Sequence, residues 1–210
     1  MHALDSSDRA KVSAILLGAG ESKRMGRDKL SLPWGKKALL EHCLDTLLKS
    51  KVREVILVLS HWIPWLKNRR NEARIKVVLN PRYRGGMSTS IRKGLRALDY
   101  RSRGVLIALG DHPRLKARTI NVLIQAFARG KGKIVVPSFQ RKMGHPVIFH
   151  RQYERELRRL KGDVGGRSVI ERHPQEVRKV RVRSEGVLRD IDTWKDYERE
   201  LKGRRTGRVE

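Results

Sequence analysis

Apolar residues fall in short blocks along the chain, and the blocks alternate between two periodicities. The seven apolar or small residues at 12–18 (VSAILLG) predict a strand that is buried on both faces. In residues 36–50 the leucines and Cys43 recur at helical spacing and form one apolar stripe, which is typical of an amphipathic helix. The same patterns predict strands at 53–59, 75–79, 104–109, 133–136 and near 177–183, and helices at 62–72, 88–98, 115–129 and 164–172.

Strands that alternate with helices indicate a mostly parallel sheet with helices on both sides, a three-layer α/β/α fold. A chain of 210 residues without an internal repeat or a linker suits one domain. In such sheets ligands bind outside the carboxyl ends of the strands. We therefore expect the site in the loops that follow the strands at 12–18, 75–79 and 104–109.

The net charge is unusual for a chain of this length. Lys and Arg number 49 against 22 Asp and Glu, which gives +27. Such a field attracts polyanions, including nucleic acids and phosphorylated substrates. The cations are spread along the whole chain, however, and 5% aromatic residues leave few stacking surfaces for bases. A basic nucleic-acid-binding protein is the alternative from a different class, but we do not expect specific nucleic-acid binding.

Other features of the sequence favour a cytoplasmic protein. One cysteine excludes an internal disulfide and fits a reducing compartment. The polar start MHALDSSDRAKVS lacks the apolar core of a signal peptide. No apolar run approaches the roughly 20 residues that span a bilayer, so we expect no membrane association.

Residues 15–29 (ILLGAGESKRMGRDK) end a strand in a glycine turn and then carry several cations. The turn Gly18-Ala19-Gly20 exposes backbone N–H groups, which can bind phosphate oxygens. The stretch is neither a dinucleotide fingerprint, because Lys23 stands where the third glycine belongs, nor a Walker P-loop, because G-K-[ST] is missing. From the residues alone, a phosphate loop and a plain structural turn both stay open.

Several segments together resemble a known family. LGAGESKRMGRDK is similar to the L-A-A-G-x-S-x-R-M-G-x-x-K signature of the MobA-like nucleotidyltransferases, and within them to the molybdenum cofactor cytidylyltransferase branch. NPRYRGGMSTSIRKGL, GDHP, GHPVIF, LKGDVGGRSVI and DIDTWKDY match in order, so the resemblance covers about residues 12–200. The chain differs in having Gly18 where alanine is usual, GDHP for A-D-x-P and GGR for G-A-R.

The resemblance implies a Rossmann-like single domain of the nucleotide-diphospho-sugar transferase type over residues 1–210, with a basic, flexible tail at about 203–210. It implies an enzyme that transfers CMP from CTP to the molybdopterin-bound molybdenum cofactor and releases pyrophosphate. It also implies Mg²⁺ or Mn²⁺ as the cofactor and a molybdoenzyme or chaperone as a partner. A GTP-dependent guanylyltransferase, or a nucleotidyltransferase with a sugar-phosphate or alcohol-phosphate acceptor, is the alternative of the same chemistry.

The resemblance also implies roles for individual residues. Arg24, Lys29 and Asp111 are the expected catalytic residues, with Arg24 on the β- and γ-phosphates and Lys29 on the α-phosphate. Asp111 and Asp192 are the expected metal ligands. Asp190 is the reserve, because alternation in an extended segment puts it on the same face as Asp192. The nucleotide is expected at Gly18, Ala19, Gly20, Ser22, Arg24, Lys29, Gly86, Ser88 and Ser90, and the acceptor at His145, Asp163 and Arg167.

For some of these residues a structural role stays open. Ser88 also suits the N-cap of the helix predicted at 88–98, and Arg167 also suits a cap of the helix at 164–172. His145 also suits a loop histidine without contact to a substrate. Cys43 lies on the apolar stripe of the helix at 36–50, which indicates a core residue rather than a nucleophile.

Overall fold

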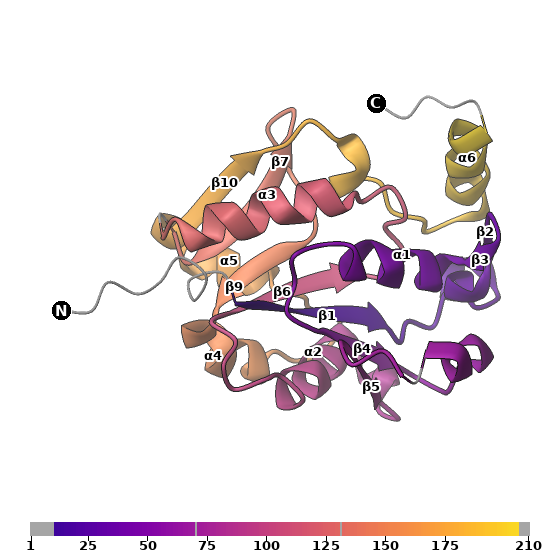
Figure 1. The fold of residues 1–210 in the computed structure, drawn as a ribbon, viewed down its shortest axis with the longest axis horizontal. Coiled ribbons are helices and arrows are strands. Elements are labelled where there is room, and N and C mark those ends of the chain that lie inside the picture. The colour runs from indigo at the N-terminus through magenta and orange to yellow at the C-terminus, as the bar shows by residue number, and fades with distance from the viewer. Residues whose placement is uncertain (1–10, 70, 131, 206–210) are drawn as a thin grey trace.

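The computed structural model describes residues 11–69, 71–130 and 132–205, and within them one large sheet crosses the molecule (Figure 1). Its eight strands lie in the order β10-β7-β9-β6-β1-β4-β5, and the short β8 pairs with β7. They are β1 (Val12–Gly18), β4 (Val55–Leu59), β5 (Ile75–Leu79), β6 (Gly104–Leu109), β7 (Ile134–Phe139), β8 (Lys142–Met143), β9 (Val147–His150) and β10 (Val177–Arg181).

Most neighbouring strands are parallel, as the alternation of strands and helices predicts. β1 pairs in parallel with β4 and β6, β4 with β5, and β7 with β10. The exceptions are the short β8, which pairs antiparallel with β7, and β9, which lies antiparallel between β6 and β7. The three-residue apolar run of β9 is too short to stand out in the sequence, and its neighbours supply the hydrogen bonds that make it a strand.

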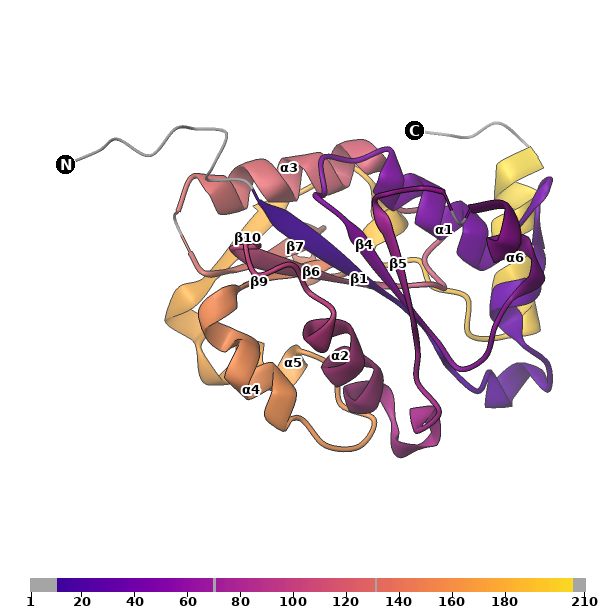
Figure 2. The same cartoon turned by 60° about the horizontal axis from the view of Figure 1, so that its bottom comes forward.

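Helices cover both faces of the sheet, which confirms the three-layer fold (Figure 2). Helices α1 (Leu39–Leu48) and α3 (Ala117–Ala128) lie on one face. Helices α2 (Met87–Arg96), α4 (Glu154–Arg159) and α5 (Arg167–Arg172) lie on the other. None of the helices within the described ranges is long and apolar enough to cross a membrane.

The last helix, α6 (Trp194–Arg205), packs at one end of the molecule beside the two-stranded ribbon of β2 (Pro33–Trp34) and β3 (Lys37–Ala38). The hydroxyl of Tyr197 in α6 donates a hydrogen bond of 2.5 Å to the carbonyl oxygen of Pro33. Short 3-10 segments connect the larger elements: Lys23–Met25, Lys29–Ser31, Pro64–Arg69, Tyr83–Gly85, Arg151–Tyr153, Pro174–Glu176 and Glu185–Val187.

Strand β1 is the centre of the core because side chains on both of its faces are buried. Leu16 joins the cluster under α1 and α3, whereas Ile15 and Leu17 join the cluster under α2, α4 and α5. Cys43 of α1 is buried in the first cluster, and this burial raises the pKa of its thiol. The thiol is therefore part of the core, as its place in the apolar stripe predicts.

Three expectations about the helices are wrong. Among residues 62–69, 71 and 72, the regular structure is the 3-10 turn Pro64–Arg69, in which Leu66 alone is buried, so a longer helix has no apolar stripe to hold it. Helix α2 begins at Met87 after Gly86, so Ser88 is not its N-cap. Residues 203–205 are the end of α6 rather than a tail, and residues 206–210 lie outside the described residues.

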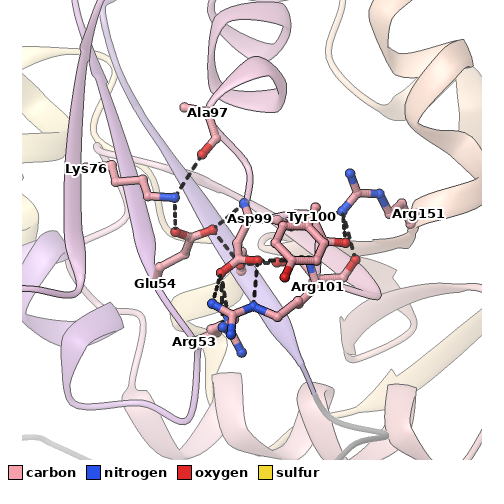
Figure 3. A network of polar contacts seen from close by, with 10 residues as sticks. Arg53, Glu54, Lys76, Ala97, Asp99, Tyr100, Arg101 and Arg151 are labelled. Carbon is pink, nitrogen blue, oxygen red and sulfur yellow. Dashed lines mark hydrogen bonds and ion pairs between the residues drawn. The ribbon is translucent and has the colours of Figure 1, made fainter.

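A network of charged groups ties the amino ends of the strands together (Figure 3). Glu54, which precedes β4, accepts hydrogen bonds from the Ser13 hydroxyl of β1 at 2.9 Å and from the Asp99 backbone N–H at 2.8 Å. Its second carboxylate oxygen lies 2.7 Å from the ammonium of Lys76 in β5. The Asp99 carboxylate accepts from the guanidinium groups of Arg53 and Arg101. This network joins β1, β4 and β5 to the loop before β6.

We expect Asp99→Asn to destabilise the protein at pH 7 and to have a smaller effect at pH 3. Bonds from Arg101 and Arg53 lower the pKa of the Asp99 carboxyl far below its ordinary value. A lowered pKa stabilises the fold fully above about pH 4, the ordinary pKa of this carboxyl, and the stabilisation declines as the pH falls from there toward the lowered pKa of the folded state. At pH 3 part of it is therefore lost. Urea unfolding at pH 7 and pH 3 measures the difference from wild type, with Glu198→Gln on α6 as the control. An equal difference at both pH values contradicts the prediction.

Candidate functional site

The loop after β1 folds back on itself and brings Lys29 to the carboxyl edge of the sheet. Ser22 adopts a left-handed backbone conformation, with φ of 51°, which turns the chain sharply. Its hydroxyl oxygen accepts a hydrogen bond of 3.1 Å from the backbone N–H of Lys29. This bond closes the loop over residues 22–29, so Ser22 fixes the position of Lys29 relative to β1.

The Lys29 ammonium lies between two carboxylates that come from distant parts of the chain. It donates to Asp111 Oδ2 at 2.7 Å and to Asp192 Oδ1 at 2.9 Å. The Arg24 guanidinium donates to Asp192 Oδ2 at 2.7 Å. The structure therefore brings together all four residues that the sequence predicts for catalysis and metal binding.

Asp111 and Asp192 meet because the C-terminal segment crosses the loop after β6. The backbone N–H of buried Ile191 donates to the carbonyl oxygen of Asp111 at 3.0 Å, which places Asp192 beside it. On the other side, the indole N–H of Trp194 donates to the Met25 carbonyl oxygen at 3.2 Å. The crossing segment is not a β-strand, so the alternation argument does not hold there, and Asp190 contacts neither Lys29 nor Arg24.

Mutual neutralisation keeps these groups charged. Burial by itself lowers the pKa of Lys29, but the carboxylates of Asp111 and Asp192 outweigh burial and raise it. For Asp192, burial raises the pKa, but the bond from Lys29 and the charge of Arg24 bring it below its ordinary value. The site at neutral pH thus contains ammonium, guanidinium and carboxylate groups in contact.

The carboxylate pair fits a hard divalent cation. Asp111 Oδ1 is buried and has no hydrogen-bond partner among the described residues, whereas Oδ2 accepts from Lys29. A cation such as Mg²⁺ takes one or two carboxylates and fills its other positions with water and phosphate oxygens. In the part of the chain that the structure describes, no cluster of three or more His, Cys, Asp or Glu side chains suits a metal. A metal held by Asp111 and Asp192 would take its other ligands from water or from a substrate.

These residues border a cavity of about 440 Å³, within the range of small-molecule sites. It opens where the loops after β1, β5 and β6 meet, as the fold class predicts. Eleven of the residues that line it come from residues 19–30 and 83–87, and they include glycines as well as cations. The predicted site residues in its lining are Ala19, Gly20, Ser22, Arg24, Lys29, Gly86, Ser90, Asp111, Asp163 and Asp192.

Two residues expected at the nucleotide, Gly18 and Ser88, do not line the cavity. Gly18 ends β1, and a Cβ there would lie 3.0 Å from side-chain atoms of Leu40 and Leu59, so this glycine allows close packing. Ser88 is fully buried, and its hydroxyl has no hydrogen-bond partner among the described residues. Ser90 does border the cavity, where its hydroxyl oxygen accepts from the Asn80 amide at 3.0 Å.

The three residues expected at the acceptor lie in different surroundings. Asp163 borders the cavity, and its carboxylate accepts from the Met87 backbone N–H at 3.2 Å. Arg167 is exposed and pairs with Glu171 at 2.9 Å, away from the cavity. Burial, aided by the neighbouring His112, lowers the pKa of His145 to about 4. Its ring is neutral at physiological pH and therefore brings no positive charge to a phosphate.

Several residues that line the cavity are not among the site residues predicted from the motifs. Glu21 and Arg84 form an ion pair of 3.4 Å between the loops after β1 and β5. Tyr83 and Met87 also line the cavity. Tyr83 and Arg84 belong to NPRYRGGM, the loop after β5, and their place after a strand is the signal that points to them.

Comparison with known proteins identifies one family and relatives whose names differ. Residues 14–177 match the family model described as the MobA-like NTP transferase domain. The chain is 27% identical to nicotine blue oxidoreductase of Paenarthrobacter nicotinovorans, with 90% of this chain and 96% of that protein covered. It is 28% identical to the molybdenum cofactor cytidylyltransferase of Escherichia coli K12, over 65% of this chain and 69% of that one.

A solved structure is also similar to this chain. The crystal structure of Rv0371c of Mycobacterium tuberculosis H37Rv in complex with manganese superposes with a TM-score of 0.73 at 27% identity. The match covers 91% of this chain and 98% of that one. The central sheet and the flanking helices thus belong to a fold that this solved protein shares.

Gly86 and Gly20 should respond differently to substitution by alanine. Gly86 has φ of 90° and ψ of 174°, and a Cβ there would lie 2.3 Å from the Gly162 backbone. Because this conformation is nearly exclusive to glycine, Gly86→Ala should lower the free energy of unfolding by about 1–3 kcal/mol. Nothing lies within 4 Å of a Cβ at Gly20. Gly20→Ala should therefore change the free energy by no more than about 0.5 kcal/mol in urea unfolding. Equal losses in the two variants contradict this reading.

Proposed function

The chain belongs to the MobA-like NTP transferase family, and on that premise we propose that it transfers CMP from CTP to the molybdopterin-bound molybdenum cofactor. An oxygen of the acceptor phosphate attacks the α-phosphorus of CTP. The bond between the α-phosphorus and the bridging oxygen breaks, and pyrophosphate leaves with the electron pair. The contact of Lys29 with Asp111 and Asp192 beside a nucleotide-sized cavity is the observation that carries this proposal.

The main difficulty of this reaction is that two anions must approach each other. Arg24 can hold two phosphate oxygens with its planar, forked guanidinium, and 71% of its side chain is exposed toward solvent. Lys29, in the loop held by Ser22, supplies a positive charge for the α-phosphate. Positioning and charge stabilisation of this kind account for most of the catalysis of phosphoryl transfer.

Asp111 and Asp192 would hold a divalent cation, Mg²⁺ or Mn²⁺, against the phosphates. When bound, such an ion neutralises charge on the phosphates and orients the leaving group. This choice is supported by Asp111 Oδ1, which is buried without a hydrogen-bond donor among the described residues, and by the manganese complex of a related protein. The lining glycines and the exposed N–H groups after β1 would bind the sugar and phosphates from the opposite side.

The base and the acceptor rest on resemblance. The segments LGAGESKRMGRDK and GGMSTSI, and the relative from Escherichia coli, favour CTP and the molybdenum cofactor. A molybdoenzyme or its chaperone would then receive the product. GTP with the same acceptor, or a sugar phosphate or alcohol phosphate in place of the cofactor, is the alternative outcome of the same chemistry.

Pyrophosphate release tests the reaction. We expect release that requires CTP, the molybdenum cofactor and Mg²⁺ or Mn²⁺, and a fall of at least 100-fold in Lys29→Ala and Asp111→Asn. Lys37→Ala is the matched control, because Lys37 also lies between two carboxylates, those of Asp45 and Glu41, but away from the cavity. Normal turnover in Lys29→Ala and Asp111→Asn would exclude the proposed site. Duplex-nucleic-acid binding without any turnover would favour the alternative class.

Thermal shifts with CTP, GTP, ATP and UTP, each with Mg²⁺, test the choice of base. A nucleotide at 100 times its dissociation constant stabilises the folded state by about 2.7 kcal/mol, a shift of roughly 5–10 °C in a protein of this size. We expect the largest shift with CTP and no shift beyond that of Mg²⁺ alone in Asp111→Asn. Equal shifts for all four nucleotides would contradict cytidine specificity and leave the transfer chemistry in place.

A further inference from the structure

The free site is internally neutralised. Two carboxylates, Asp111 and Asp192, face two cations, Lys29 and Arg24, at distances of 2.7 to 2.9 Å. Their formal charges cancel, so no net negative charge remains to attract a divalent cation. The Lys29 ammonium lies in contact with both carboxylates at once, which is the relation that a bridging metal would need.

We propose that Lys29, by occupying the carboxylates of Asp111 and Asp192, prevents them from binding a free divalent cation, so that the cation enters this site with the nucleotide. The inference rests on the proposed function, because it takes Asp111 and Asp192 as ligands of the metal that accompanies a nucleoside triphosphate. It adds the form in which this substrate is bound: the metal–nucleotide complex, rather than the metal first and the nucleotide second.

Burial makes this contact hard to replace. The side chains of Lys29 and Asp111 are only 13% and 17% exposed, so their attraction is screened less than that of a surface pair. A metal ion without a nucleotide would have to displace a buried ammonium and leave it without a partner, which is costly. Asp111 Oδ1, which accepts no hydrogen bond among the described residues and lies 3.9 Å from His112 Nε2, offers a single ligand, too few for Mg²⁺ or Mn²⁺ by itself.

A triphosphate removes this obstacle. Its oxygens can accept the hydrogen bonds of Lys29 and Arg24, and the two carboxylates are then free to bind a cation. Arg24 is the more exposed of the two cations, at 71%, and Asp192 is 40% exposed, so their ion pair faces the solvent side of the cavity. The phosphates thus reach Arg24 before Lys29, and the buried contact between Lys29 and Asp111 is exchanged last.

Titration of the protein with Mn²⁺, followed by the paramagnetic resonance signal of the free ion, tests this inference without any turnover. In the absence of nucleotide, Lys29→Met should bind Mn²⁺ at least tenfold more tightly than wild type, because the carboxylates lose their internal counter-ion. Lys29→Arg, which keeps the positive charge, should resemble wild type. Adding Asp111→Asn to Lys29→Met should abolish the gain.

Lys37→Met is the matched control, since Lys37 also bridges two carboxylates outside the cavity, and it should leave Mn²⁺ binding unchanged. Circular dichroism confirms that each variant is folded. Mn²⁺ binding to Lys29→Met that equals or is weaker than binding to wild type overturns the inference. A gain in Lys29→Met, together with a wild-type protein that transfers no nucleotide, would refute the proposed function and leave the counter-ion role of Lys29 intact.

Discussion

The contact of one ammonium with two carboxylates is the constraint on which the site depends. The carboxylates of Asp111 and Asp192 lie 2.7 and 2.9 Å from the Lys29 ammonium, and they would repel each other without a cation between them. Lys29 provides that cation in the free protein, and its bonds join the loop after β1, the loop after β6 and the segment before α6. The site is therefore a property of three segments that are far apart in the sequence.

The backbone carries these segments to one place. Parallel pairing of β1 with β6 brings their carboxyl ends side by side, and the N–H of Gly110 continues the pairing by donating to the Leu17 carbonyl oxygen. The bond from Ile191 to Asp111 then adds the C-terminal segment. Since all these bonds are made by the main chain, many sequences can build the frame, and the three charged side chains give it chemistry.

The hydrophobic pattern of a segment predicts those elements whose formation depends on that segment alone. Strand β1 has the predicted bounds because a strand buried on both faces must be apolar throughout, and Asp111 follows β6 as predicted. The sequence does not reveal β9, because its strand character comes from hydrogen bonds to β6 and β7. It does not reveal α6 either, because most residues of Trp194–Arg205 are charged and give no apolar stripe.

The role of a glycine in the site is likewise not determined by the sequence motif alone. Gly18 and Gly86 both belong to motifs that indicate phosphate binding, yet each is required by packing as well. Gly18 leaves room for Leu40 and Leu59, and Gly86 leaves room for the backbone of Gly162. These neighbours lie far from the glycines in the sequence, so only the fold tells which role a glycine has.

The balance of charge within the site gives the large net charge a physical meaning. The whole chain carries a net charge of +27, yet within the site the positive charges of Lys29 and Arg24 cancel the negative charges of Asp111 and Asp192. A positive field of this kind repels a free divalent cation and attracts an anion. A metal–triphosphate complex is a net anion, so the field of the whole protein and the neutralised carboxylate pair favour the same species. The long-range and the short-range electrostatics thus select the metal in its nucleotide-bound form.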